Sequence, residues 1–323
     1  MATKLNAFAF SSQMFRPGPW DSEASHADTI YSSNFFPLTL LSDSELFIGY
    51  ENVLRDIRQV LKESMGLDIS IYKQDIVQGH IKRRMLMHKF ERIADYLDYL
   101  QEHTDEIQAL YQDILIKVTS FFRDREFFDG LMDDLFPKIS QGRRSDDPIR
   151  IWVAGCATGE EVYSLAISLN EYLKKIKSEA HFQVFASDID ELALQKARIG
   201  IYSRASIGTI PVAERERYFV RVEEGYQIVK CLREACHFIR HNVVDKLPVS
   251  GLDLISCRNL LIYLDQKIQQ KVISQFHEAL NSTGFILLGS SETVGGCADL
   301  FRLLGKQGKV YEKKHFQMRV PCL

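Results

Sequence analysis

The sequence has no run of about 18 or more uninterrupted apolar residues, the length that a membrane-spanning helix requires. Its amino terminus also lacks the positively charged start and long apolar run of a secretory signal. From these absences we expect a soluble, cytoplasmic protein without direct membrane insertion. At 323 residues, with 46% hydrophobic and 26% charged positions, the chain is long enough to bury a sizeable core and to hold two domains.

Cysteine is scarce, and the charge is nearly balanced. Six cysteines, several of them inside apolar runs, argue against a disulfide framework. The formal net charge is only −3, so no global excess of basic residues points to nucleic acid. Cys231, Cys236, His237 and His241 lie close in sequence, but neighbouring residues on a strand point to opposite faces, so we expect no metal site.

The pattern of apolar residues changes along the chain. Residues 1–45 show no sustained periodicity, which indicates an irregular tail. Over 46–128 apolar residues recur three or four positions apart, which predicts a small all-helical domain. The stretch 129–148 ends in the polar "SQGRRSDDP" and is predicted to be a linker. From 149 to 323, short apolar strands alternate with helices.

This strand–helix alternation predicts an α/β domain with a mainly parallel sheet that is covered on both faces. Strands are expected at 151–154, 182–187 and 252–257, for example. Residues 201–237 interrupt the alternation and indicate an inserted, small antiparallel β-subdomain. Ligands in sheets of this kind bind at the carboxyl ends of the strands, so we expect a ligand beside the loop that follows the first strand.

The loop after the first strand, "GCATGEE" (155–161), has two glycines but no lysine. It therefore does not match the Gly-x4-Gly-Lys of a phosphate-binding P-loop. A dinucleotide-binding loop needs three glycines, and here Glu160 and Glu161 stand where the diphosphate would lie. A cofactor with a nucleoside and a positive group but no phosphate fits, because either glutamate can pair with an ammonium group. S-adenosylmethionine (SAM) is such a molecule.

Asp188 follows the next strand in "VFASDID" and supports a nucleoside-binding site. A carboxylate at this position can accept hydrogen bonds from both ribose hydroxyls. Each observation also has a plainer explanation, because acids favour the first turn of any helix and Asp188 could cap the helix that follows it. Taken alone, these residues leave both explanations open.

Eight segments occur in the order and near the spacing seen in CheR-type chemoreceptor methyltransferases, and the sequence resembles that family over about residues 50–315. The segments are "VTSFFRD" (118–124), "GCATGEEVYSLA" (155–166), "VFASDID" (184–190), "KARIGIY" (196–202), "RYF" (217–219), "RHNVVDKLP" (240–248), "LDLISCRNLLIYLD" (252–265) and "LLGSSE" (287–292). The resemblance implies a class I SAM methyltransferase fold, which is Rossmann-like with a seven-stranded sheet. It also implies a protein-glutamate O-methyltransferase that esterifies chemoreceptor glutamates and releases S-adenosylhomocysteine.

The resemblance further implies the roles of individual residues. Arg123 is expected to steer the carboxylate that receives the methyl group, and Tyr263 is expected close to that methyl. The remaining contacts that it implies are Thr119 and Arg123 near the cofactor, Glu160 or Glu161 at the methionine end, Asp188 on the ribose, Asn242 and Val243 beside the adenine, and Arg258 and Asn259 beneath the cofactor.

The receptor-binding surface is predicted from charge. Residues 73–92 contain six basic and two acidic side chains, and the basic helix around Lys82, Arg83 and Arg84 is expected to meet acidic receptor helices. A solvated helix face would show the same charges. The insertion is short and lacks a Gly-x-Gly, which argues against a tether to a receptor peptide.

We expect a monomer that binds no nucleic acid. Two other functions remain compatible with the same pocket. One is a non-catalytic signalling module that binds SAM or its product, and the other is a methyltransferase for another protein or a small molecule.

Overall fold

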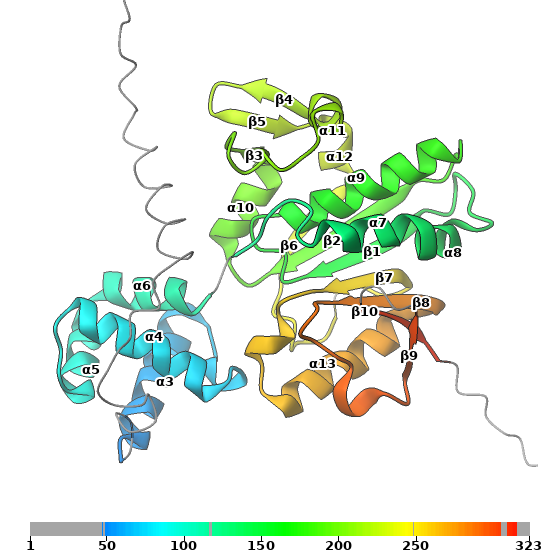
Figure 1. The fold of residues 1–323 in the computed structure, drawn as a ribbon. Helices are drawn as coiled ribbons and strands as arrows, with labels where there is room; N and C mark the ends of the chain where they lie inside the picture. The colour runs from blue at the N-terminus through cyan, green and yellow to red at the C-terminus, as the bar shows by residue number, and fades with distance from the viewer. Residues whose placement is uncertain (1–46, 48, 116–117, 248, 305–308, 315–323) are drawn as a thin grey trace, which may run out of the picture. The chain divides into compact units, whose positions relative to one another are not determined.

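The computed structural model describes residues 47, 49–115, 118–247, 249–304 and 309–314. The tail expected at 1–45 lies outside these residues. A helical region comes first in the described chain, and a region built around a sheet follows it (Figure 1).

The helical region has the apolar spacing predicted from the sequence. Leu54, Ile57 and Leu61 recur along one side of its first helix and are buried. That helix ends at Gly66, whose φ of 70° is a left-handed conformation that glycine adopts without strain. The elements are α3 (Glu51–Met65), the 3-10 turn η1 (Ile69–Ile71), α4 (Gln74–Met87), α5 (Ile93–Glu102) and α6 (Thr104–Ile114).

Two helices occupy most of the stretch that the sequence indicated as a linker. They are α7 (Arg125–Asp134) and α8 (Phe136–Ser140). Phe128, Leu131 and Phe136 are buried in the same core cluster as strand β1 (Ile149–Ala154), so the first half of the stretch 129–148 is helical and packed. The apolar residues that precede the polar end of this stretch are spaced three to five positions apart, which suits a packed helix.

The sheet has seven strands in the order β6-β2-β1-β7-β8-β10-β9. β1, β2, β6, β7 and β8 run parallel, while β10 pairs antiparallel with β8 and β9. This confirms the predicted mainly parallel seven-stranded sheet. The strands are β1 (Ile149–Ala154), β2 (Phe182–Asp188), β6 (Cys236–Arg240), β7 (Leu252–Cys257), β8 (Leu280–Leu288), β9 (Phe301–Leu304) and β10 (Lys309–Lys313).

Both faces of the sheet are buried, as expected for parallel strands. Alternate residues of β1 show this directly, because Ile151 belongs to one core cluster and Trp152 to the other. The first cluster includes residues of α9 (Glu160–Lys175) and α10 (Glu191–Ile199), and the second includes residues of α13 (Gln266–Ala279). Figure 1 shows α9 and α13 on opposite sides of the sheet.

The insertion is a three-stranded antiparallel sheet of order β3-β5-β4 (Figure 1). This confirms the predicted β-subdomain. Its elements are β3 (Ile201–Tyr202), α11 (Val212–Tyr218), β4 (Phe219–Val222), β5 (Gly225–Ile228) and α12 (Lys230–Glu234). Across the described residues, none of the helices combines the length and the hydropathy needed to pass through a bilayer.

Candidate active site

The loop between β1 and α9 depends on two glycines. Gly155 has φ 70° and Gly159 has φ 94°, conformations that side chains rarely allow. A Cβ on Gly155 would lie 2.9 Å from Cδ2 of Leu260, and one on Gly159 would lie 2.9 Å from Cβ of Ala197. The glycines therefore let this loop fold tightly against its neighbours, and Gly155 lines the cavity that opens beside it.

This cavity lies at the carboxyl ends of β1, β2 and β7, the edge at which the sequence predicted a ligand. Its lining includes seven of the predicted site residues, namely Thr119, Arg123, Glu161, Asp188, Arg258, Asn259 and Tyr263. An adjoining hollow is lined by Asp188 together with Asn242 and Val243. The structure thus brings together every predicted site residue except Glu160.

Asp188 joins the two hollows and also holds the glycine loop. Its Oδ2 accepts a hydrogen bond from the backbone N–H of Ala157 at 2.8 Å, and its Oδ1 accepts one from the N–H of Asp190 at 2.9 Å. Burial raises the pKa of Asp188, and these backbone donors oppose the rise. The helix after β2 is capped instead by Asp190, whose side chain accepts from the N–H of Leu192, so Asp188 is not that cap.

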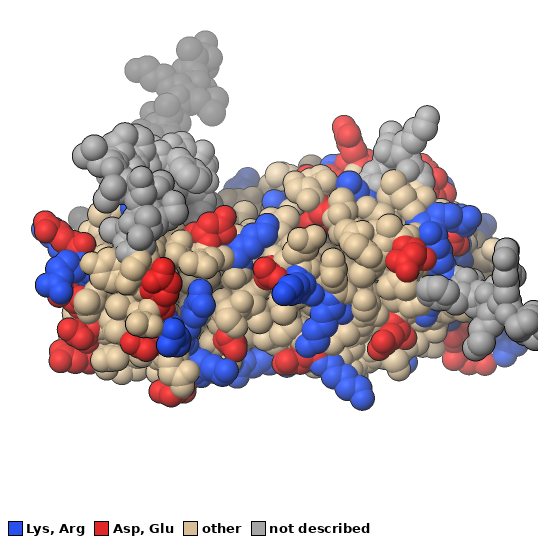
Figure 2. All heavy atoms as spheres, turned by 90° about the horizontal axis from the view of Figure 1, so that it is seen from below, with Lys and Arg blue, Asp and Glu red and all other residues tan. Residues whose placement is uncertain are grey.

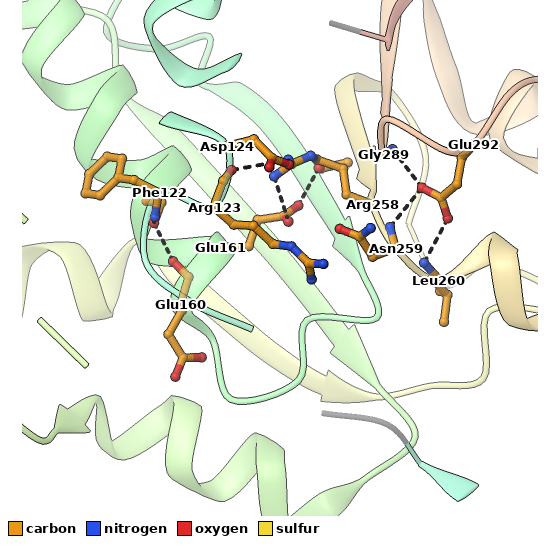
Figure 3. A network of polar contacts seen from close by, with 12 residues as sticks. Phe122, Arg123, Asp124, Glu160, Glu161, Arg258, Asn259, Leu260, Gly289 and Glu292 are labelled. Atoms are coloured by element: carbon orange, nitrogen blue, oxygen red, sulfur yellow. Dashed lines mark hydrogen bonds and ion pairs between the residues drawn. The ribbon is translucent and has the colours of Figure 1, made fainter. Parts of the chain in front are cut away.

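The two adjacent glutamates have different environments. Glu161 lines the cavity, where it accepts hydrogen bonds from Ser256 Oγ at 2.6 Å and Arg258 Nη1 at 3.3 Å. The Glu160 carboxylate accepts a hydrogen bond from Thr158 Oγ1 at 2.6 Å. It points away from Glu161 and Arg258 (Figure 3). Successive residues of a helix point about 100° apart, so only one of the pair can face the cavity. Of the two glutamates predicted as cofactor contacts, Glu161 lines the cavity and Glu160 does not.

Arg258 connects three parts of the site. Its Nη2 lies 2.6 Å from Asp124 Oδ2 and its Nη1 lies 3.3 Å from Glu161 Oε2 (Figure 3). Its guanidinium carbon lies 4.4 Å from the ring centroid of Phe127. The side chain is only 2% exposed. A buried arginine with two carboxylate partners is held rigidly, so Arg258 ties the end of β7 to α9 and to the segment 118–124.

The segment 118–124 is strained on both sides of Arg123. Phe122 has φ 50° and Asp124 has φ 62°, a left-handed conformation that is unusual for a residue with a side chain. Each such residue costs about 1–3 kcal/mol and persists only when its surroundings impose it. Here the N–H of Phe122 donates to Ser164 Oγ at 2.9 Å, and Asp124 is held by Arg258.

The strained segment presents the Arg123 guanidinium to the cavity. Its Nη1 donates to the carbonyl oxygen of Val118 at 3.1 Å. Among the described residues, no carboxylate forms an ion pair with it. Arg123 can therefore bind an incoming carboxylate.

Tyr263 ends a 3-10 turn, η2 (Leu261–Tyr263), and lines the same cavity as Arg123. Burial raises the pKa of its phenol, an effect that the nearby positive charge of Arg123 partly offsets. The phenol is thus protonated at neutral pH and can donate a hydrogen bond into the cavity.

Glu292 is a site residue that sequence reasoning missed. Its side chain is buried and accepts four backbone N–H groups at 2.7–2.9 Å (Figure 3). The donors are Asn259, Leu260, Leu261 and Gly289. Three of them form the turn that carries the cavity residues after β7, so Glu292 fixes that turn. The sequence offers only one hint, the acid in "GSSE" near the end of a strand.

Comparison with known proteins assigns the chain to a protein family. The model of the CheR methyltransferase SAM-binding domain matches residues 117–310, and that of the CheR methyltransferase all-alpha domain matches 52–115. The chain belongs to the CheR methyltransferase family.

Relatives support this family assignment. A chemotaxis protein methyltransferase of Borreliella burgdorferi is 30% identical over 75% of this chain and 88% of its own length. One of Escherichia coli is 31% identical over 78% of this chain and 88% of its own length. An uncharacterized 104.1 kDa protein in the hypE 3' region of Rhodobacter capsulatus is 30% identical over 82% of this chain, which spans only 28% of that protein.

The cavity of this CheR family member suits SAM, the cofactor of the matched domain. Two carboxylates, Glu161 and Asp188, line it, and the pKa of each is raised by burial, so a cationic group there would offset their desolvation. Because Gly155 has no Cβ, its backbone is accessible at a point where a Cβ would clash with the side chain of Leu260. SAM carries positive charge and ribose hydroxyl donors, and both kinds of group can bind to carboxylates.

We expect Glu292→Gln to lower the methyl-transfer rate of this CheR protein roughly tenfold, by analogy with losses in supporting residues around active sites. The amide NH2 group would face backbone N–H donors in place of an oxygen acceptor, leaving buried donors unpaired. The rate at saturating SAM and the affinity for S-adenosylhomocysteine are the measurements. Equal rates for the variant and the wild type would show that Glu292 does not support the turn.

The basic helix predicted to meet the receptor is largely buried. Lys82 is 8% exposed, and Arg84 lies 2.5 Å from the buried Glu106, so neither presents a free charge to solvent. Only Arg83 of the three is substantially exposed, at 40%. The acidic partner of Arg84 lies on α6, 22 residues further along the chain, so of the three basic residues Arg83 is the one best exposed for a receptor contact. On the face in Figure 2, basic and acidic side chains are interspersed.

Proposed function

We propose that this protein transfers the methyl group of SAM to glutamate side-chain carboxylates on the cytoplasmic helices of a chemoreceptor. The products would be glutamate methyl esters and S-adenosylhomocysteine, so the protein would act as a protein-glutamate O-methyltransferase. Membership of the CheR family and the names of its chemotaxis relatives support this proposal.

The observation that carries the proposal is the position of Arg123. A guanidinium that lines the cofactor cavity beside Tyr263 can orient a carboxylate in front of a methyl donor. Arginine suits this task because its planar fork matches the two oxygens of a carboxylate. Its bond to the Val118 carbonyl leaves other N–H groups of the guanidinium for the substrate.

Methyl transfer to a glutamate carboxylate requires no acid–base catalysis by the protein. The glutamate carboxyl has an ordinary pKa of about 4.3, so it is ionised at neutral pH and needs no general base. When bound, SAM supplies an electrophilic methyl group on a positively charged sulfur. The protein's residues then contribute orientation and exclusion of water, because opposite charges on nucleophile and donor diminish as the bond forms.

Five polar residues that line the cavity have a part in this scheme. Arg123 orients the acceptor carboxylate, and the protonated phenol of Tyr263 faces the reacting groups. Glu161 and Asp188 bind the ammonium and ribose groups, and Arg258 holds Glu161 in place. Asn242 and Val243 flank the adenine in the adjoining hollow.

One assay tests the proposal. The protein is incubated with methyl-labelled SAM and a receptor cytoplasmic fragment, and the labelled fragment is then treated with alkali. We expect the label to be released as methanol, because a methyl ester is hydrolysed by base. Label that resists alkali would indicate N-methylation, and binding of SAM without any transfer would indicate a signalling module.

We expect cofactor affinity to fall as the pH is lowered from about 8 to about 5. Burial raises the pKa of Glu161 and of Asp188, so these carboxyls gain protons at a higher pH than ordinary ones do. An ammonium group bound by Glu161 and ribose hydroxyls that donate to Asp188 both favour the ionised carboxylates, so protonation opposes binding. Calorimetry with S-adenosylhomocysteine across this range is the measurement. An affinity that stays constant or increases on acidification would contradict the assignment.

A further inference from the structure

The short segment between η1 and α4 is hydrogen-bonded to the turn that carries Tyr263. The N–H of Lys73 donates to the carbonyl oxygen of Tyr263 at 2.9 Å, and the N–H of Asp265 donates to the carbonyl oxygen of Ile71 at 3.0 Å. Together they form an isolated antiparallel bridge. A part of the chain that precedes the sheet by more than 70 residues is thereby attached to the active-site turn.

Tyr72 lies between these two hydrogen bonds and lines both hollows of the site. The residues shared by the two linings are Tyr72, Gly155, Asp188, Ile189 and Leu260. Asp188 is the proposed ribose ligand, and the second hollow is the proposed adenine pocket. The ring of Tyr72 is therefore placed at the nucleoside end of the cavity.

The phenol of Tyr72 lies near a carboxylate. Burial raises the pKa of the Tyr72 phenol, and the negative charge of Asp188 raises this pKa further, so the hydroxyl keeps its proton. The segment that leads into it is well ordered, because Asp68 caps η1 by accepting from the N–H of Ser70 at 3.1 Å and Ile69 is buried. The backbone that carries Tyr72 is thus fixed before a ligand binds.

We propose that Tyr72 is a cofactor-binding residue supplied by the helical region, and that the bridge to the Tyr263 turn holds its ring over the nucleoside of SAM. The inference rests on the SAM site of the proposed function. It gives the helical region a direct part in the active site, in addition to any part in receptor recognition. An aromatic ring against a base or sugar strengthens binding through stacking.

The first test replaces the ring. Tyr72→Ala is expected to weaken the affinity for S-adenosylhomocysteine about tenfold, measured by calorimetry, because one stacking contact is lost. Tyr72→Phe keeps the ring and is expected to lose less affinity. Tyr99→Ala is the matched control within the helical region, because the Tyr99 ring stacks on His103 and lines neither hollow.

The second test removes one bond of the bridge. Lys73 has φ −58°, and Tyr72 before it has an extended backbone, so proline fits at 73 and deletes only the N–H group. Lys73→Ala loses the same side chain but keeps the N–H. We expect roughly threefold weaker binding for Lys73→Pro than for Lys73→Ala, the effect of one net hydrogen bond.

The outcomes separate the two proposals. A wild-type protein that does not bind S-adenosylhomocysteine would overturn the proposed function. A wild-type protein that binds it, with Tyr72→Ala binding equally well, would overturn the role of Tyr72 alone. Should Tyr72→Ala fail to fold in a thermal unfolding experiment, the Lys73 pair decides, and equal affinities of its two variants would overturn the inference.

Discussion

Replacing Arg123 by alanine is expected to slow methyl transfer to a receptor fragment by about 100-fold or more, the scale of losing one group that acts on the reacting charge. The affinity for S-adenosylhomocysteine is expected to change by less than about threefold, because in the described structure the guanidinium bonds only to a backbone carbonyl. Initial rates of base-labile labelling at saturating SAM, with calorimetry beside them, give both quantities.

Arg123→Lys is the matched variant. It keeps the positive charge but loses the planar fork, so we expect a rate between those of the alanine variant and the wild type. If the alanine variant lost rate and affinity by the same factor, Arg123 would belong to the cofactor pocket alone. If the lysine variant were fully active, charge without geometry would account for its role.

A second large effect is expected at Glu161. Glu161→Gln removes a carboxylate that lines the cavity and pairs with the buried Arg258, so the affinity for SAM should fall about 10- to 100-fold. Calorimetric titration with SAM and with S-adenosylhomocysteine measures this loss.

The neighbouring glutamate is the control. Glu160→Gln makes the same chemical change one residue earlier, at a carboxylate bonded to Thr158 that does not line the cavity. It should leave the cofactor affinity within about twofold of the wild type, since distant polar changes act mainly on stability. If Glu160→Gln instead weakened binding and Glu161→Gln did not, the roles assigned to the pair would be reversed.

The features predicted from the sequence are those that depend on short stretches of chain. The uninterrupted apolar run "IWVA" predicted a strand buried on both faces, and Ile151 and Trp152 lie in separate cores. The glycines at 155 and 159 predicted a tight loop at the strand end, which their positive φ values explain. The family resemblance supplied Arg123 and Tyr263, which composition alone does not single out.

The features that could not be predicted depend on contacts between distant segments. The charges of Lys82 and Arg84 were visible, but the partner that buries Arg84 is Glu106, which lies on another helix. Tyr72 looked like any residue of a helical region, because only the bridge to Leu264 places it in the site. Glu292 acts on backbone groups about 30 residues away, which no local pattern reveals.

The late position of Glu292 in the chain affects how the protein matures. During synthesis the glycine loop and Asp188 leave the ribosome well before Glu292, so the turn after β7 then lacks the carboxylate that holds its N–H groups. Contacts of such long sequence separation form late and slowly in folding. The turn that carries the cavity residues after β7 can therefore reach its final hydrogen bonding only after the chain has been made as far as Glu292.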